Sequence, residues 1–155
     1  MNEQFMREAI RISVEKMRDG LGGPFGAVVV KDNQIIARGW NQVTSANDPT
    51  AHAEIVALRE ACRQLGDFRL PGCELYSSCE PCPMCLGAIY WARVDRLFYA
   101  ATRQDAAEAG FDDDWLYREI PLPLPQRRLP THQLLREAAL DAFAQWKAKP
   151  NRIPY

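Results

Sequence analysis

Two short segments, Ala51-His52-Ala53-Glu54 and Ser78-Cys79-Glu80-Pro81-Cys82-Pro83-Met84-Cys85, decide how the rest of this 155-residue chain is interpreted. The first supplies an imidazole and a carboxylate, and the second supplies the thiols of Cys82 and Cys85. Zn²⁺ in catalytic sites is held by three protein ligands, and its fourth position stays open for water. His52, Cys82 and Cys85 are therefore the predicted zinc ligands, and Glu54 lies beside them as a group that need not bind the metal.

Length and composition describe an ordinary globular protein. The chain is 47% hydrophobic and 25% charged, and a chain of 155 residues can bury a core without disulfides. We expect one domain over residues 1–155. No apolar run approaches the roughly 20 residues that a membrane span needs, and the first residues lack the basic and apolar regions of a leader peptide. We therefore expect a cytoplasmic protein that does not bind membranes.

The cysteine count and the charge restrict the partners. Five cysteines are an odd number, which argues against a framework of disulfides and suits a reducing compartment where paired thiols bind metal. The formal net charge is -1 and the pI is near 6.1, whereas a nucleic-acid-binding protein usually carries a clustered basic face. We expect a small-molecule substrate rather than a nucleic acid.

Hydrophobic periodicity and the positions of glycine and proline predict a mixture of helices and strands. The predicted elements are, in order, a helix over residues 2–18, strands over 25–30 and 35–40, a loop over 41–49, a helix over 51–65, a strand over 73–77, a helix that begins at Pro81 and Pro83, a strand over 96–101, a short helix over 105–110, and a helix from Leu134 to Trp146. The strand, helix, strand order over residues 73–101 predicts a parallel pair. Asp48 or Thr50 is the predicted N-cap of the helix over 51–65.

The C-terminal part of the sequence predicts an extended connection followed by an amphipathic helix. Pro121, Pro123, Pro125 and Pro130 forbid a continuous helix. The helix after them has an apolar stripe that must pack on something, and we expect Trp146 to lie in a core. A long connection of this kind would let residues 131–155 cover the pocket of their own subunit or exchange with a second copy.

The spacing of the site residues predicts how they reach one metal ion. His52 and Glu54 would lie about 200° apart around a helix, so they can serve the same ion only if that helix points at it end-on. Cys82 and Cys85 share one side of a helical first turn, where the helix N-terminus lowers the pKa of a thiol. We therefore expect two helix N-termini to converge on the metal. Zinc would lower the pKa of water toward about 7, and Glu54 would move the protons that expelling ammonia requires.

The pattern His52-Ala53-Glu54 followed by Pro81-Cys82-Pro83-Met84-Cys85 resembles the H-x-E…P-C-x-x-C signature of the cytidine deaminase superfamily. Residues 22–27, 47–54, 82–93 and 105–113 are similar to the bacterial guanine deaminases of that superfamily. This resemblance extends to about Glu119, fades through the proline-rich segment and returns weakly in the tail.

The resemblance implies an α/β protein, a three-layer α/β/α sandwich with a five-stranded mixed sheet, that is usually a homodimer. It implies one Zn²⁺ per subunit on His52, Cys82 and Cys85, with Glu54 as proton shuttle. The implied reaction is the hydrolysis of guanine to xanthine and ammonia.

The resemblance also implies residues that bind the substrate. Asn41 would hold the purine, Phe25 would pack on its ring, and Asp113 would contact the edge that is deaminated and help to move protons. Ala53, inside the first motif, Trp91, at the end of the helix after Cys85, and Tyr155, in the tail, are further candidates for substrate contacts.

Several alternatives stay open at the level of sequence. A purely structural zinc would need a fourth protein ligand, for which Cys79 is the candidate. A redox pair of Cys82 with Cys85 lacks a thioredoxin-like context. The acidic run 112–114 could be a solvated turn.

Among deaminases, a tRNA adenosine deaminase shares the zinc motif but needs a basic path for the phosphate backbone. Deaminases of other substrates, such as cytosine or an aminotriazine, would use the same chemistry.

Overall fold

The computed structural model describes residues 2–155, apart from the side chain of Asp113. The chain divides into two compact units, which meet in sequence between Tyr117 and Arg118. We call the part up to Tyr117 the core unit and Arg118–Tyr155 the C-terminal unit. The expectation of one domain over the whole chain stays a prediction.

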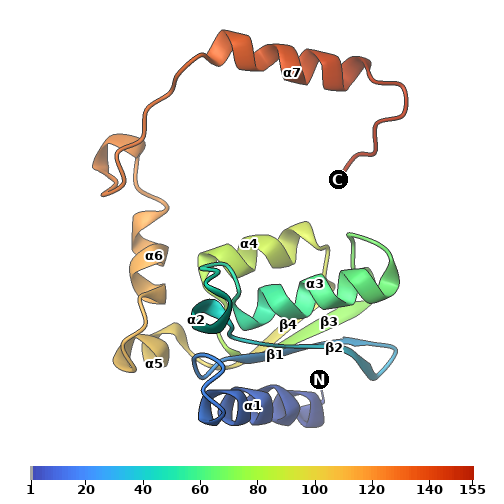
Figure 1. The fold of residues 1–155 in the computed structure, drawn as a ribbon, viewed down its shortest axis with the longest axis vertical. Coiled ribbons are helices and arrows are strands. Elements are labelled where there is room, and N and C mark those ends of the chain that lie inside the picture. The colour runs from blue at the N-terminus through green and yellow to red at the C-terminus, as the bar shows by residue number, and fades with distance from the viewer. Residues whose placement is uncertain (1) are drawn as a thin grey trace. The chain divides into compact units, whose positions relative to one another are not determined.

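A mixed sheet lies at the centre of the core unit (Figure 1). Its strands are β1 (Gly26–Lys31), β2 (Gln34–Trp40), β3 (Cys73–Cys79) and β4 (Arg96–Ala101), in the spatial order β2-β1-β3-β4. β1 pairs antiparallel with β2 and β3, and β3 pairs parallel with β4, as the strand, helix, strand order predicts. Asp32 and Asn33 join β1 to β2 with φ angles of 49° and 59°, the backbone that a tight two-residue hairpin turn requires.

The five-stranded sheet implied by the family resemblance is wrong for the described residues, where the sheet has four strands. After β4 the chain forms the helices α5 (Arg103–Glu108) and α6 (Asp113–Glu119). The prolines that follow, beginning at Pro121, lack the N–H donor that a strand needs for pairing. In the described residues, the chain after β4 adds no fifth strand to this edge of the sheet.

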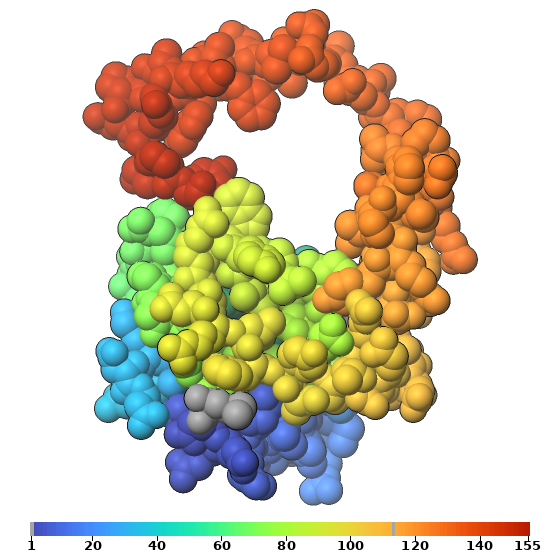
Figure 2. All heavy atoms as spheres, turned by 180° about the vertical axis from the view of Figure 1, so that it is seen from behind, coloured from blue at the N-terminus to red at the C-terminus, as the bar shows by residue number. Residues whose placement is uncertain are grey.

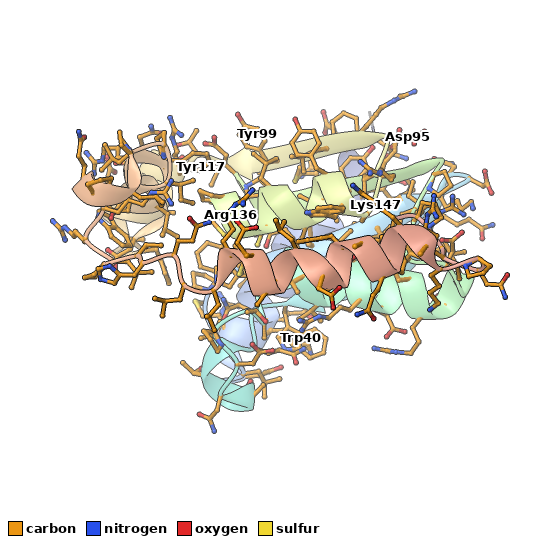
Figure 3. The ribbon with its side chains drawn as sticks, turned by 90° about the horizontal axis from the view of Figure 1, so that it is seen from above. Trp40, Asp95, Tyr99, Tyr117, Arg136 and Lys147 are labelled. Atoms are coloured by element: carbon orange, nitrogen blue, oxygen red, sulfur yellow. The ribbon has the colours of Figure 1, made fainter. Side chains whose placement is uncertain are left out.

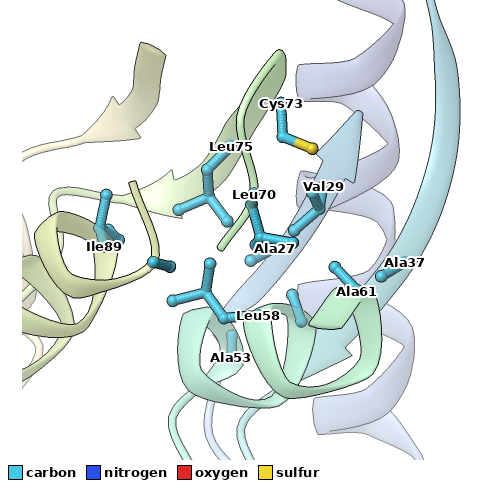
Figure 4. Packing of buried hydrophobic residues seen from close by; sticks show 12 residues of the cluster. Ala27, Val29, Ala37, Ala53, Leu58, Ala61, Leu70, Cys73, Leu75 and Ile89 are labelled. Atoms are coloured by element: carbon cyan, nitrogen blue, oxygen red, sulfur yellow. The ribbon is translucent and has the colours of Figure 1, made fainter. Parts of the chain in front are cut away.

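Helices cover both faces of the sheet (Figure 1). α1 (Glu3–Arg18) packs on one face, and α3 (Ala53–Leu65) packs on the other, where α4 (Pro83–Trp91) lies beside it. Alternate residues of β1 point to the two faces: Val28 and Val30 join the cluster under α1, and Ala27 and Val29 join the cluster under α3 (Figure 4). The strand is therefore buried on both sides, which explains its continuous apolar sequence.

Two glycines let the helices approach the sheet closely. A Cβ atom at Gly26 would lie 2.3 Å from the carbonyl oxygen of Ala9 in α1. A Cβ atom at Gly39 would lie 2.1 Å from the carbonyl oxygen of Ala53 and 2.5 Å from the nitrogen of Ala57, both in α3. The depth at which α3 packs on the sheet, and so the position of its first turn, depends on the missing side chain at Gly39.

The structure changes the predicted start of α3. Neither Asp48 nor Thr50 is its N-cap, because His52 occupies that position. The Asp48 carboxylate instead accepts hydrogen bonds from the Thr50 N–H at 2.8 Å and the Thr50 hydroxyl at 2.7 Å, which forms a local turn before the helix. The predicted loop over 41–49 also contains a short helix, α2 (Val43–Ala46).

The C-terminal unit contains a 3-10 turn, η1 (Leu124–Gln126), and the helix α7 (Arg136–Ala148). None of the α7 residues is buried. The prediction that Trp146 lies in a core is wrong for the single chain, in which this residue is 39% exposed, because the short elements of the C-terminal unit do not enclose α7. Within residues 2–155, no helix combines the length and the apolar character needed to cross a membrane.

We predict that Gly39→Ala lowers the free energy of unfolding by about 2–3 kcal/mol, because the new methyl group must displace the backbone of α3. Urea denaturation measures this change. Gly87→Ala in α4 is the matched control: no atom lies within 4 Å of the added Cβ, so this variant should be neutral or more stable by up to about 1 kcal/mol. Equal stabilities for the two variants would contradict the close approach of α3 to β2.

Candidate active site

Two helix N-termini meet at the predicted metal ligands. His52 is the N-cap of α3 and Cys82 is the N-cap of α4, with Pro83 at the first position of that helix. His52 has extended backbone angles (φ -68°, ψ 156°) and therefore precedes the first helical turn, which contains Glu54. This geometry confirms the end-on arrangement predicted from the His-x-Glu spacing.

The imidazole and the two thiols form one compact group. One nitrogen of His52 and the sulfurs of Cys82 and Cys85 all lie within 4.8 Å of one another, and Cys82 Sγ is 3.7 Å from His52 Nδ1. These separations suit ligands of one tetrahedral zinc, whose bonds to nitrogen and sulfur are about 2.0–2.3 Å long. Cys79 is outside this group, and its sulfur lies 3.6 Å from the Thr102 carbonyl oxygen. The position of Cys79 argues against a structural zinc with four protein ligands.

The electrostatics of the group also suit a metal cation. A hydrogen bond from the Cys85 thiol lowers the pKa of Cys82 to about 4, and the neighbouring His52 ring contributes in the same direction. The same hydrogen bond and burial raise the pKa of Cys85. The two thiols therefore share one proton, and a bound cation would take its place by holding both sulfurs as thiolates. The donor set fits zinc.

Glu54 is a buried carboxyl group beside these ligands. It is 6% exposed, and the Ser77 hydroxyl donates a hydrogen bond to its Oε1 atom at 3.1 Å. Burial raises the pKa of Glu54 because the charged form is poorly solvated there. A carboxyl group in such a position binds a proton more tightly than a solvated one.

A pocket of about 370 Å³ opens onto this group. The residues that line it are Gly23, Phe25, Asn41, Val43, Thr44, His52, Glu54, Glu80, Cys82, Phe111, Asp112 and Leu116. The rings of Phe25 and Phe111 meet edge to face, with their centroids 4.7 Å apart. Aromatic walls of this kind suit a flat ring.

Asn41 presents a fixed donor to the pocket. Its Oδ1 atom accepts hydrogen bonds from the backbone N–H groups of Gly23 and Val43, each at 3.3 Å. These two bonds orient the side-chain amide and leave its NH₂ group as the part that can bind a ligand. Asn41 is 9% exposed, so a ligand that bonds to this group must enter the pocket.

The structure brings most of the predicted site residues together. Phe25, Asn41, His52, Glu54 and Cys82 line one pocket, and Cys85 completes the metal group. Asp113 is the first residue of α6, and its side chain lies outside the described part of the chain.

Two predicted substrate contacts within the core unit do not line this pocket. Ala53 is fully buried at the start of α3. Trp91 is 61% exposed at the end of α4, where its ring lies 5.9 Å from the Arg93 guanidinium carbon. Tyr155 belongs to the C-terminal unit and is exposed.

Sequence reasoning missed part of the pocket wall. Phe111 and Leu116 line the pocket, and Ser77 holds Glu54, but none of the three belongs to a motif of fixed spacing. Phe111 alone had a signal, because it follows Gly110 in a segment that resembles guanine deaminases. Glu80 was visible inside the second motif but had no predicted role.

Comparisons with known proteins agree with the family that the sequence motifs resemble. The family model of the cytidine and deoxycytidylate deaminase zinc-binding region matches residues 1–101. Guanine deaminase from Bacillus subtilis (strain 168) is 53% identical over 154 residues, 99% of this chain and 99% of that protein. An X-ray structure of guanine deaminase from Bacillus subtilis has a TM-score of 0.97 and covers 100% of this chain and 99% of that chain.

Two more distant comparisons define the limits of the similarity. A structure solved in complex with 2,6-diaminopurine is 33% identical, with a TM-score of 0.66, and covers 97% of this chain and 83% of that chain. A tRNA-specific adenosine deaminase from Agrobacterium fabrum is 51% identical, but over only 89 residues, 56% of this chain and 59% of that protein. The match to the family model, the similarity over nearly the full length and the His, Cys, Cys group together show that the chain belongs to the zinc-binding cytidine and deoxycytidylate deaminase family.

Proposed function

We propose that this protein hydrolyses guanine to xanthine and ammonia, with one zinc ion per subunit on His52, Cys82 and Cys85. The observation that carries the proposal is one pocket that combines aromatic walls, the oriented Asn41 donor and a buried carboxyl group beside the metal-binding group. Near-complete coverage by a guanine deaminase supports the substrate, because the similarity to the Agrobacterium fabrum tRNA-specific adenosine deaminase covers only 56% of this chain.

Bound zinc supplies the acidity that lets a water molecule act as a nucleophile near neutral pH. Glu54 takes the proton from that water as its oxygen forms a bond to C2 of guanine, and delivers a proton to the ring nitrogen. Glu54 then takes the remaining proton from the oxygen now bonded to C2 and gives it to the 2-amino group; the C2–N bond breaks as the C2=O bond forms, and ammonia leaves. The Ser77 hydrogen bond holds the carboxyl group in place through these transfers.

The pocket walls orient the purine for this reaction. Phe25 packs on the ring, and the Asn41 NH₂ group donates to an acceptor on the base. We place Asp113 at the amino group that is removed, since the preceding residue, Asp112, already lines the pocket. Water exclusion by the aromatic rings strengthens each of these polar contacts.

The first test is Glu54→Gln. We expect ammonia release from guanine to fall by about 10²- to 10⁴-fold, because the amide cannot accept the proton, while zinc stays at one ion per chain. A coupled ammonia assay and zinc analysis on the same sample measure both. Glu60→Gln, on the exposed side of the same helix, is the control. Retained turnover would show that Glu54 is not the proton shuttle. The substrate is tested on the wild-type protein: formation of inosine in tRNA without any release of ammonia from guanine would favour the tRNA alternative.

The second test is Asn41→Asp. The carboxylate has the same shape and keeps an oxygen for the N–H groups of Gly23 and Val43, but it replaces the NH₂ donor with an acceptor. We expect kcat/KM for guanine to fall by about 10- to 100-fold with zinc content unchanged. Steady-state kinetics give the result, and an unaltered kcat/KM would remove Asn41 from substrate binding.

We further propose that the protein is a homodimer in which residues 131–155 pack on the partner subunit. Leu134 is 83% exposed, and Leu135 and Phe143 are also exposed. Packing on a second copy of the chain would bury these apolar side chains and so stabilise the dimer. The core unit has exposed aromatic side chains of its own, Tyr90 and Trp91, at the end of α4, which lies open on the face seen in Figure 2. In this arrangement Tyr155 covers a pocket.

Deletion of residues 150–155 tests the role of the tail. We expect KM for guanine to rise about tenfold or more, since the pocket loses its cover. Co-expression of the truncated chain with full-length Glu54→Gln then separates two cases. Exchange between subunits predicts recovered activity, because the intact tail of the inactive chain covers the truncated chain's site. Absence of recovery would place the tail over its own subunit, and unchanged kinetics of the truncated protein would exclude a cover altogether.

A cytoplasmic location completes the proposal. All five cysteines are free, and two of them must stay reduced to bind the metal. A reducing compartment meets this requirement, whereas a disulfide between Cys82 and Cys85 would remove two of the three ligands.

A further inference from the structure

A hydrogen bond joins the pocket wall to the loop that carries a metal ligand. The Tyr117 hydroxyl donates to the Pro81 carbonyl oxygen at 2.7 Å, across 36 positions of sequence. Pro81 is fully buried and directly precedes Cys82. Tyr117 belongs to α6, whose Leu116 lines the pocket. This bond is therefore a direct connection between the wall and the metal-binding loop.

Arg103 holds Tyr117 from the other side. Its guanidinium carbon lies 4.4 Å from the centroid of the Tyr117 ring, and its Nε atom is 3.9 Å from Asp114 Oδ1. The backbone N–H of Arg103 also donates to Glu80 Oε2 at 3.1 Å, and Glu80 lines the pocket. Arg103 thus contacts α6 through its side chain and the second motif through its backbone.

The length of α6 makes these contacts important. A helix of seven residues is too short to be stable in water by itself, so its position depends on the side chains that anchor it. The segment just before it carries Phe111 and Asp112, which also line the pocket. A shift of α6 would therefore move a whole side of the pocket relative to His52 and Cys82.

We propose that Tyr117 and Arg103 are positioning residues, which fix the α6 side of the pocket to the metal-binding loop and so set the affinity for the substrate. The part that concerns substrate rests on the proposed function, whereas the anchoring of α6 does not. Neither residue touches the reacting atoms.

Tyr117→Phe tests the proposal, because it removes only the hydroxyl group. Calorimetry with 2,6-diaminopurine measures affinity in zinc-loaded protein that also carries Glu54→Gln, which keeps any turnover slow during the titration. We expect binding about five- to tenfold weaker, unchanged zinc content, and amide hydrogen exchange about five- to tenfold faster in residues 113–119 but not in α3. Tyr99→Phe, an exposed tyrosine on β4 that lines no part of this pocket, is the matched control; Figure 3 labels both tyrosines.

Arg103→Lys gives a second, independent variant that keeps the charge but loses the planar group over the ring. If the two residues act together, the double variant should bind no more weakly than the weaker single variant. Effects that multiply, or Tyr117→Phe results equal to those of Tyr99→Phe, would overturn the proposal. If neither the parent protein nor any variant binds 2,6-diaminopurine, the proposed function is wrong. The anchoring of α6 is tested separately: unchanged amide hydrogen exchange in residues 113–119 of Tyr117→Phe would refute it.

Discussion

The convergence of two helix N-termini on one point is the constraint on which the site depends. Each N-terminus carries unpaired N–H groups and a partial positive charge, which stabilise a thiolate and would stabilise the charges of a metal group. α4 begins at Pro83, with Cys82 as its N-cap, because β3 ends at Cys79 and Pro83 favours the first helical turn. α3 begins at Ala53, with His52 as its N-cap, at a depth permitted by Gly39. The sheet and both helices are therefore the scaffold that brings one imidazole and two thiols together.

The site combines groups that are costly to bury, and the structure offsets the cost locally. Glu54 sits in a poorly solvated position, where Ser77 satisfies one of its oxygen atoms. Cys82 and Cys85 share a hydrogen bond, so only one of them needs to be charged in the absence of metal. Such a group gains stability when a cation binds, because the cation compensates both thiolates at once. Metal binding and the raised pKa of Glu54 thus follow from the same dry environment.

The pocket is assembled from segments that are far apart in sequence. Phe25 and Asn41 come from the first hairpin, whereas Phe111 and Leu116 come from the segment after β4. The second group is attached through short elements, and the Tyr117 hydroxyl is one of the contacts that hold it. The metal-binding group and this second wall therefore come from different parts of the sequence, and they meet only in the folded chain.

The sequence by itself determined the residues of the metal-binding group, the carboxyl group beside them and most of the elements, because those features depend on spacing within a few residues. The helices over 3–18 and 53–65, the hairpin turn at Asp32 and the parallel pair of β3 and β4 all follow from local periodicity and element order. Only the tertiary structure decided that His52 caps α3, that the sheet has four strands, and that Phe111 faces Phe25. These features arise from contacts between residues distant in sequence, whose free energies depend on how the layers pack, and no local pattern encodes that packing.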